Sequence, residues 1–236
     1  MNTDNTDASN TDAGNTGDSW QAAASLIDEL TSKARTAQTS LGQSSHKARC
    51  NALLQIAAEL RAETNQILAA NQLDLANANN KGLSDAFIDR LTLTPDRIEA
   101  MAVGVEAIAG LPDPLGKSLA RWTVPSGLEI ERVSTALGVI GIIYESRPNV
   151  TIDAGALCLK SGNAAILRGG SDSLHSSLTL TNIMQNSLVQ TGLADSCIQM
   201  IPTPDRTAVT ALLRASGKVD VIVPRGGKGL VARVQE

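Results

Sequence analysis

An asparagine that directly follows a buried stretch is the first residue whose position suggests chemistry. Asn149 follows Arg147 and Pro148, just after an apolar run that begins at Gly138. A side-chain amide at such a strand end can donate a hydrogen bond to a carbonyl oxygen that gains negative charge during a reaction. An asparagine in a turn can equally satisfy its own backbone, and the pattern alone does not separate the two roles. Arg147 is a candidate for holding an anionic substrate, although most arginines form surface ion pairs.

A second polar group follows the next apolar run. Arg168, Gly169 and Gly170 come directly after the buried pattern at residues 163–167. A guanidinium can bind a phosphate through two parallel hydrogen bonds, and glycine lets the backbone approach a ligand closely. An ordinary strand-to-helix turn has a similar composition, so both interpretations stay open on the pattern alone.

A glycine-rich turn forms the third candidate site. It comprises Pro224, Arg225, Gly226 and Gly227, after the apolar run at residues 219–223 and before a helical pattern. Free N–H groups at the start of a helix suit anions. The turn also begins a match to G-x-G-x-x-A, a short pattern that recurs by chance. Arg225 is a further candidate for holding an anionic substrate.

The cysteines favour neither a metal site nor thiol chemistry. Cys50, Cys158 and Cys197 are odd in number and lack the spacing of metal ligands, so no metal site and no disulfide framework is predicted. Buried cysteines usually behave as small hydrophobes. His46 and His175 show no linkage to them in the sequence, so no Cys–His pair is predicted.

The candidate residues must be positioned by an alternation of strands and helices. Strands are predicted near 138–144, 163–167, 197–201 and 219–223, and helices near 151–160, 172–190, 205–214 and from Gly227. This alternation predicts right-handed β–α–β crossovers and therefore an α/β fold with a Rossmann-like parallel sheet and flanking helices. The carboxyl ends of such strands share one edge, where open α/β sheets bind ligands.

The first half of the chain is predicted to be helical. Apolar residues recur with a 3.6-residue period through residues 20–110. One helix is expected from about Ser45 to Ala78, with a break near residues 63–66. Ser84 is expected to cap a short helix, and Thr94 to precede another that has a proline in its first position.

Two segments lie outside the helices and the parallel sheet. Residues 1–19 consist mainly of Asn, Thr, Asp, Gly and Ala and bury too little apolar area to offset ordering entropy, so a disordered leader is predicted. Residues 118–135 alternate around a Pro-Ser-Gly turn and predict a β-hairpin arm. The expected organisation is a leader followed by a single domain over residues 20–236.

The composition excludes several classes of partner. The chain is 42% hydrophobic but only 2% aromatic, and its net charge is -4. A neutral folded part without a basic patch predicts no nucleic-acid partner and no anionic membrane surface. No apolar run reaches the ~18–20 residues of a membrane span, and no signal peptide is visible, so a cytoplasmic protein is expected.

Three segments resemble one known family. Tyr144–Val150 reads YESRPNV and is similar to YEARPNV of the γ-glutamyl phosphate reductases, which belong to the aldehyde dehydrogenase superfamily. Gly162–Gly170 resembles that family's GNAVILRGG, and Val219–Gly227 resembles its VDMLIPRGG. The segments occur in the family's order, within a resemblance that runs from about Ala48 to the end of the chain.

The resemblance implies roles for the candidate residues. Asn149 matches the asparagine that donates to the oxyanion in the superfamily. Arg168 matches a basic residue that contacts the adenosine ribose or its 2′-phosphate, and residues 224–227 would lie near the pyrophosphate and nicotinamide of the cofactor. An arginine favours NADPH/NADP over NADH. Asp172 departs from the family pattern and adds negative charge near that phosphate, which leaves the preference open.

The resemblance also implies an activity. The family, also called glutamate-5-semialdehyde dehydrogenase, reduces L-glutamyl 5-phosphate with NADPH to L-glutamate 5-semialdehyde and phosphate in L-proline biosynthesis. A cysteine thiolate forms a thioacyl intermediate, whose oxyanion Asn149 would stabilise, and hydride transfer releases the aldehyde. Glutamate 5-kinase and further copies of the chain, joined through the hairpin arm, are the implied protein partners.

The family's nucleophilic cysteine has no match in this sequence. We therefore expect an N-terminal fragment that carries an incomplete NADP-binding domain without the catalytic thiol domain, and that is inactive alone. Two alternatives are a non-catalytic NADP-binding or interaction module and another aldehyde dehydrogenase, which would use a glutamate base to oxidise aldehydes. The RPNV and LRGG segments favour the phosphate reductase over the latter.

Overall fold

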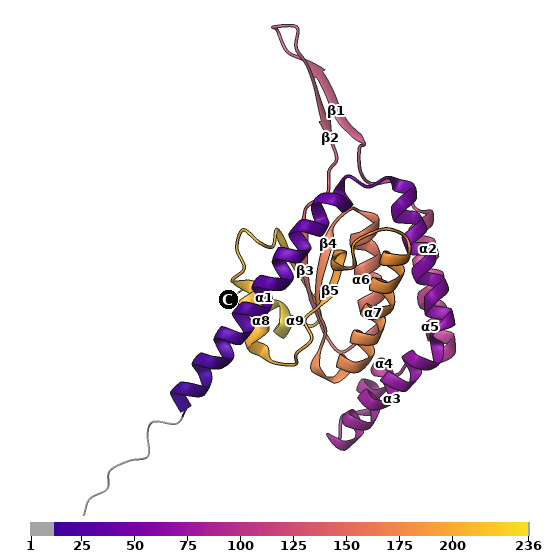
Figure 1. Ribbon diagram of the computed structural model, residues 1–236, viewed down its shortest axis with the longest axis vertical. Coiled ribbons are helices and arrows are strands. Elements are labelled where there is room, and N and C mark those ends of the chain that lie inside the picture. Colours follow the sequence, from indigo (N-terminus) through magenta and orange to yellow (C-terminus); the bar gives the residue numbers. More distant parts are fainter. Residues whose placement is uncertain (1–11, 236) are drawn as a thin grey trace, which may run out of the picture.

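The computed structural model describes residues 12–235, which fold into a helical N-terminal part, a hairpin arm and an α/β core (Figure 1). The N-terminal helices are α1 (Asp12–Gly42), α2 (His46–Ala62), α3 (Thr64–Asn80), α4 (Asp85–Leu91) and α5 (Pro95–Gly110). The arm consists of β1 (Ser118–Thr123) and β2 (Glu129–Val133). The core contains β3 (Val139–Tyr144), α6 (Pro148–Lys160), β4 (Ala164–Arg168), η1 (Ser171–Ser173), α7 (Leu174–Gln190), η2 (Asp195–Cys197), β5 (Ile198–Met200), α8 (Arg206–Leu213), β6 (Val221–Arg225) and α9 (Lys228–Gln235).

The core sheet is parallel, as the strand–helix alternation predicts. Its strand order is β5-β4-β3-β6, with Ile142 of β3 opposite Leu167 of β4 and Val223 of β6. The chain winds outward from β3 to β5 and then returns to place β6 on the other side of β3. The strand order therefore reverses beside β3, and ligands of open α/β sheets bind at such a reversal.

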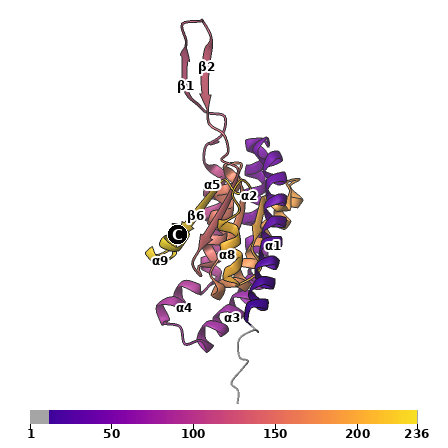
Figure 2. The ribbon, with the colours of Figure 1, turned by 90° about the vertical axis from the view of Figure 1, so that its left-hand side faces the viewer.

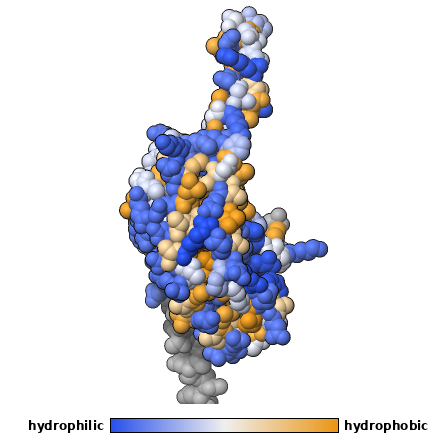
Figure 3. Space-filling view, turned by 90° about the vertical axis from the view of Figure 1, so that its right-hand side faces the viewer, coloured by the Kyte–Doolittle hydropathy of each residue, from blue (hydrophilic) through white to orange (hydrophobic). Residues whose placement is uncertain are grey.

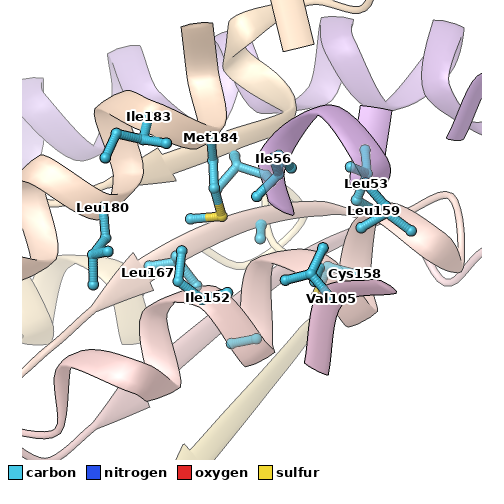
Figure 4. Close-up of a cluster of buried hydrophobic side chains, with 14 of the residues drawn as sticks. Leu53, Ile56, Val105, Ile152, Cys158, Leu159, Leu167, Leu180, Ile183 and Met184 are labelled. Atoms are coloured by element: carbon cyan, nitrogen blue, oxygen red, sulfur yellow. The ribbon is translucent and has the colours of Figure 1, made fainter. Parts of the chain in front are cut away.

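Helices cover both faces of the sheet and explain why its central strands are so apolar. Every residue of β3 and β4 is buried. One core cluster joins the sheet to α6 and α7 and, beyond them, to α2 and α5 (Figure 4). A second cluster joins the opposite face to α1 and α8. Strands buried on both faces need continuous apolar sequence, which is the pattern found here.

The arm projects from this body. In Figures 1 and 2 the β1–β2 hairpin rises clear of the other elements. Its side chains include Leu119, Trp122 and Leu128, which are 55%, 46% and 62% exposed. Figure 3 shows hydrophobic residues between hydrophilic ones along the arm. The predicted hairpin is confirmed, and its apolar side chains lack cover from the described residues of this chain.

Most predicted helix boundaries agree with the structure. The predicted break in the long helix is confirmed, because α2 and α3 meet at Glu63. Thr94 caps α5 by accepting a hydrogen bond from the backbone N–H of Arg97. Ser84 occupies the N-cap position of α4, but its side chain makes no capping hydrogen bond.

Three predicted boundaries were wrong. Helix α1 begins at Asp12, inside the predicted leader of residues 1–19, since extending an existing helix costs far less than starting one; residues 1–11 lie outside the described residues. Helix α6 begins at Pro148, a favourable first helical residue. Strand β6 begins at Val221, two residues after the predicted start. The carboxylate of Asp220 accepts the backbone N–H of Val139, and the backbone N–H of Asp220 donates to the carbonyl oxygen of Val139.

Candidate functional site

A cavity lies at the carboxyl ends of β3 and β4, between the sheet and helices α4, α8 and α9. Its volume is about 810 Å³. Five of the residues predicted from the sequence line it: Arg147, Arg168, Gly169, Gly170 and Gly227. The other predicted site residues, Asn149, Pro224, Arg225 and Gly226, do not line it. The structure therefore divides the predicted residues into two neighbouring groups.

Arg168 is the most unusual residue of the cavity. It is only 6% exposed, and its Nη2 donates a hydrogen bond to the carbonyl oxygen of Pro204 at 3.0 Å. Its buried Nε has no hydrogen-bond partner, and among the described residues no carboxylate forms an ion pair with it. Burial lowers the pKa of Arg168, with the charge of Arg206 adding to that lowering. A buried cation with an unsatisfied donor is costly unless an anion completes its surroundings.

Arg206 is a second cation that sequence reasoning missed. It is the first residue of α8 and lines the same cavity as Arg168. Asp205 caps this helix by accepting the N–H of Thr207 at 2.8 Å. Arg206 starts the helix that follows the predicted strand at 197–201, so its place after a strand of the parallel sheet was a signal that could have found it.

Asp172 also lines the cavity and is already paired. Its Oδ1 is 2.7 Å from Nζ of Lys81, at the end of α3, and Ser146 Oγ donates weakly to its other oxygen at 3.5 Å. The negative charge of Asp172 is therefore partly neutralised by a residue 91 positions away. Sequence reasoning did not identify Lys81, because nothing in the local pattern links the two.

Two residues of the second group meet at Asp153 on α6. Asn149 is exposed in the first turn of α6, rather than in a loop, and its Nδ2 donates to Oδ2 of Asp153 at 3.4 Å. Arg225 Nη1 is 3.9 Å from the same oxygen. Burial raises the pKa of Asp153, although Arg225 and Asn149 oppose that effect. Asn149 and Arg225 thus share one carboxylate at the carboxyl ends of β3 and β6.

The predicted glycine-rich turn is shorter than the sequence pattern suggested. Pro224 and Arg225 are the last residues of β6, where proline is tolerated because β6 is an edge strand of the sheet formed by the described residues. The backbone N–H of Gly227 donates to Oε1 of Glu145 at 2.7 Å. A carboxylate therefore occupies the start of α9, the position where an anion was predicted.

The cysteines lie away from the cavity, but one prediction about them was wrong. No cysteine is among the described residues that line the cavity. Burial raises the pKa of the Cys158 thiol to about 12 and that of Cys197 to about 11. Cys50, however, does pair with a histidine: its Sγ is 3.3 Å from Nε2 of His46. Both residues project from one face of α2, four positions apart, a spacing that could have signalled the contact.

The described part of the chain places His175 outside the cavity and contains no metal-binding group and no membrane-spanning helix. His175 contributes a backbone N–H to Asp74 at 3.1 Å, and it does not line the cavity. Within residues 12–235 no group of three or more His, Cys, Asp or Glu side chains is placed to hold a metal ion. None of the helices in this range is long and apolar enough to span a membrane.

The fold and the cavity together define a doubly wound α/β domain with a cavity at the reversal of strand order, where ligands of such folds bind. Residues 5–236 match the model of the aldehyde dehydrogenase family, and the chain belongs to this family. The predicted fold class is thereby confirmed.

Individual relatives show which enzymes of this family the chain resembles. The chain is 54% identical over 217 residues to a γ-glutamyl phosphate reductase of Gluconobacter oxydans, covering 92% of this chain and 51% of that relative. A crystal structure of γ-glutamyl phosphate reductase from Thermotoga maritima is 37% identical with a TM-score of 0.87, over 89% of this chain and 50% of that one. The enzyme from Saccharomyces cerevisiae is 34% identical with a TM-score of 0.82, over 88% and 53%. The chain spans about half the length of the curated relatives it matches.

Proposed function

We propose that this chain is the NADP-binding part of a γ-glutamyl phosphate reductase, which reduces L-glutamyl 5-phosphate to L-glutamate 5-semialdehyde and phosphate in L-proline biosynthesis in the cytoplasm. The observation that carries the proposal is the buried Arg168, with an unpartnered Nε, at the end of β4. The named relatives support the substrate, and the chain spans about half the length of each.

The charges of the cavity favour a cofactor that carries a 2′-phosphate. Arg168 and Arg206 both line it, and the charge of Arg206 lowers the pKa of Arg168. A dianionic phosphate between them would relieve that repulsion and complete the hydrogen bonding of Arg168. Lys81 reduces the opposing charge of Asp172. NADPH therefore fits this cavity better than NADH, which presents hydroxyl groups at the same position.

The residues around Asp153 are suited to the end of the cofactor at which the substrate reacts. The bound cofactor would supply hydride to the acyl carbon. Asn149 holds Asp153 through a long hydrogen bond of 3.4 Å, so its amide can turn toward a developing oxyanion at little cost. Arg147 and Arg225 are exposed cations, and both are suited to binding an anionic substrate. The backbone N–H of Gly227 donates a hydrogen bond to Glu145. If the cofactor pyrophosphate binds at the start of α9, it must replace Glu145 as the acceptor of that hydrogen bond.

A non-catalytic NADP-binding module is the second candidate function. It is favoured by the absence of a cysteine among the described residues of the cavity and by the position of Asn149 outside it. The two functions differ in whether the complete protein reduces NADP in the presence of L-glutamate 5-semialdehyde and phosphate. That reverse reaction, followed by absorbance, decides between them.

Cofactor titration tests the site itself. Arg168→Met is expected to weaken NADPH binding about 10–100-fold, the equivalent of about 1.5–3 kcal/mol for a charged hydrogen-bonded pair, and to leave NADH binding almost unchanged. Arg206→Met should act in the same direction. Arg121→Met removes an exposed arginine of the arm and serves as the control. Equal losses for both cofactors in Arg168→Met would contradict the assignment of the 2′-phosphate.

The hairpin arm supports a homo-oligomer. Its exposed Leu119, Trp122 and Leu128 offer apolar area to a second copy. Replacing Trp122 with Ser should lower the oligomeric mass seen by sedimentation. We also propose glutamate 5-kinase as a protein partner, because an acyl phosphate is labile in water and gains from direct transfer.

A further inference from the structure

A cluster far from the cavity brings a cysteine, a histidine and a lysine into contact. His46 and Cys50 project from the start of α2, and Lys160 is the last residue of α6. Lys160 is only 3% exposed. Its Nζ is 2.7 Å from His46 Nε2, 3.2 Å from Cys50 Sγ and 2.7 Å from the carbonyl oxygen of Ala109. The function proposed above uses none of these residues.

The surroundings of Lys160 are unusual for a buried amine. An ammonium has three donors, and the three acceptors around Nζ account for all of them. Among the described residues no carboxylate forms an ion pair with it. Asp113 interacts electrostatically with His46, but its ion pair is with Arg49. The lysine is therefore held by a thiol, an imidazole and a backbone carbonyl rather than by an acid.

The distances suit a bond between sulfur and nitrogen. Reacting atoms held about 3–3.5 Å apart are in a near-attack arrangement. Sγ of Cys50 and Nζ of Lys160 are 3.2 Å apart, and Cys50 is only half-buried, so a small oxidant can reach its sulfur. His46 Nε2 contacts both atoms and can accept a proton from either.

We propose that Cys50 and Lys160 form an oxidative cross-link, a sulfenamide, with His46 as the proton acceptor and hydrogen peroxide as the oxidant. In the first step the sulfur attacks one oxygen of the peroxide, the O–O bond breaks, and the thiol proton leaves with the other oxygen as water. The sulfur is oxidised to a sulfenic acid and the peroxide is reduced.

The second step joins the two side chains. His46 takes a proton from Nζ, the nitrogen lone pair forms the S–N bond, and the S–O bond breaks. The departing hydroxide leaves as water with the proton held by His46, and one further proton passes from nitrogen to solvent. The balance is one thiol, one ammonium and one peroxide converted into one sulfenamide, two waters and one proton. The product ties the start of α2 covalently to the end of α6.

Peptide mass spectrometry tests the cross-link. The purified protein is treated with equimolar hydrogen peroxide and digested with trypsin. We expect linked peptides containing Cys50 and Lys160, lighter than their sum by about 2 Da, and loss of cleavage after Lys160. Dithiothreitol should reverse both changes. The proposal is overturned if Cys50 instead gains about 32 Da as a sulfinic acid, or forms a disulfide, while trypsin still cleaves after Lys160.

Two variants distinguish an effect on the cross-linking reaction from an effect on folding. Cys50→Ser keeps the size and polarity of the side chain and should abolish the linked peptides without changing the melting temperature of the untreated protein by more than a few degrees. His46→Gln should leave Cys50 oxidised but slow the linking step at least about tenfold, because it removes the proton acceptor. Cys158 and Cys197 are buried internal controls and should remain unmodified. Linking at an unchanged rate in His46→Gln would remove His46 from the mechanism.

Discussion

Gly170 and Ser146 meet so closely that no side chain fits between them. A β carbon built on Gly170 would lie 2.1 Å from Oγ of Ser146 and 2.6 Å from its backbone nitrogen. The contact joins the loops that follow β4 and β3, so it fixes the end of β4 at Arg168 and the loop that leads to Arg147. Glycine was predicted here for close approach to a ligand, but the close approach that the structure shows is between two loops.

Gly170→Ala should therefore destabilise the protein. Because one of the clashing atoms belongs to the backbone, the loops must separate, at a cost of about 1–3 kcal/mol in the free energy of unfolding. Gly104→Ala is the matched control, since Gly104 is inside α5 and a β carbon added there would meet nothing within 4 Å. That change should stabilise by about 0.5–1 kcal/mol. Urea denaturation measures both, and equal effects would contradict the contact.

Tyr144 should make stability fall at high pH. Burial raises the pKa of Tyr144 to about 12, although hydrogen bonds from Thr151 and Ser177 oppose it. The unfolded phenol ionises near pH 10, so the unfolded state binds fewer protons above that pH. Stability is then present below pH 10 and is lost by about 1.4 kcal/mol per pH unit until about pH 12.

Tyr144→Phe tests this dependence by removing the ionisable group. The variant should be less stable near neutral pH by about 1 kcal/mol, because the hydrogen bond of 2.7 Å to Thr151 Oγ1 is lost. Its stability should fall less steeply between pH 10 and 12 than that of the wild type. Parallel slopes would show that other groups control alkaline unfolding.

The buried ion pair of Arg49 should contribute strongly to stability. Arg49 is 1% exposed, and its Nη2 lies 2.7 and 2.9 Å from the two oxygens of Asp113. Asp113→Asn leaves a buried cation without its partner and should cost about 3 kcal/mol. Asp89→Asn breaks the exposed pair with Arg97 and should cost about 0.5 kcal/mol or less. Thermal unfolding of the two variants compares them directly.

Lys81 should influence cofactor binding without contacting the phosphate. In Lys81→Met the charge of Asp172 is no longer balanced, and NADPH affinity should fall about fivefold, the equivalent of about 1 kcal/mol. Asp172→Asn in the same protein should restore it. Lys47→Met, at another exposed lysine, is the control. A loss that Asp172→Asn does not rescue would mean that Lys81 acts through structure instead of charge.

Much of the fold follows from local sequence. The apolar runs of β3 and β4, the break at Glu63 and the proline that opens α5 all express preferences of neighbouring residues. The position of Arg168 at a strand end was likewise visible, because strand ends in a parallel sheet share one edge. Helix starts were less predictable: α1 and α6 both begin earlier than the patterns indicated.

The sequence by itself determined the elements of this protein and the edge of the sheet at which its polar residues gather. The tertiary structure alone decided which of those residues share a cavity, that Lys81 balances Asp172, and that Lys160 meets Cys50 from 110 positions away. The physical reason is that periodicity and capping depend on residues a few positions apart. A contact between residues far apart in the sequence depends on how whole helices pack against the sheet. No local sequence pattern predicts which of these residues come close in space.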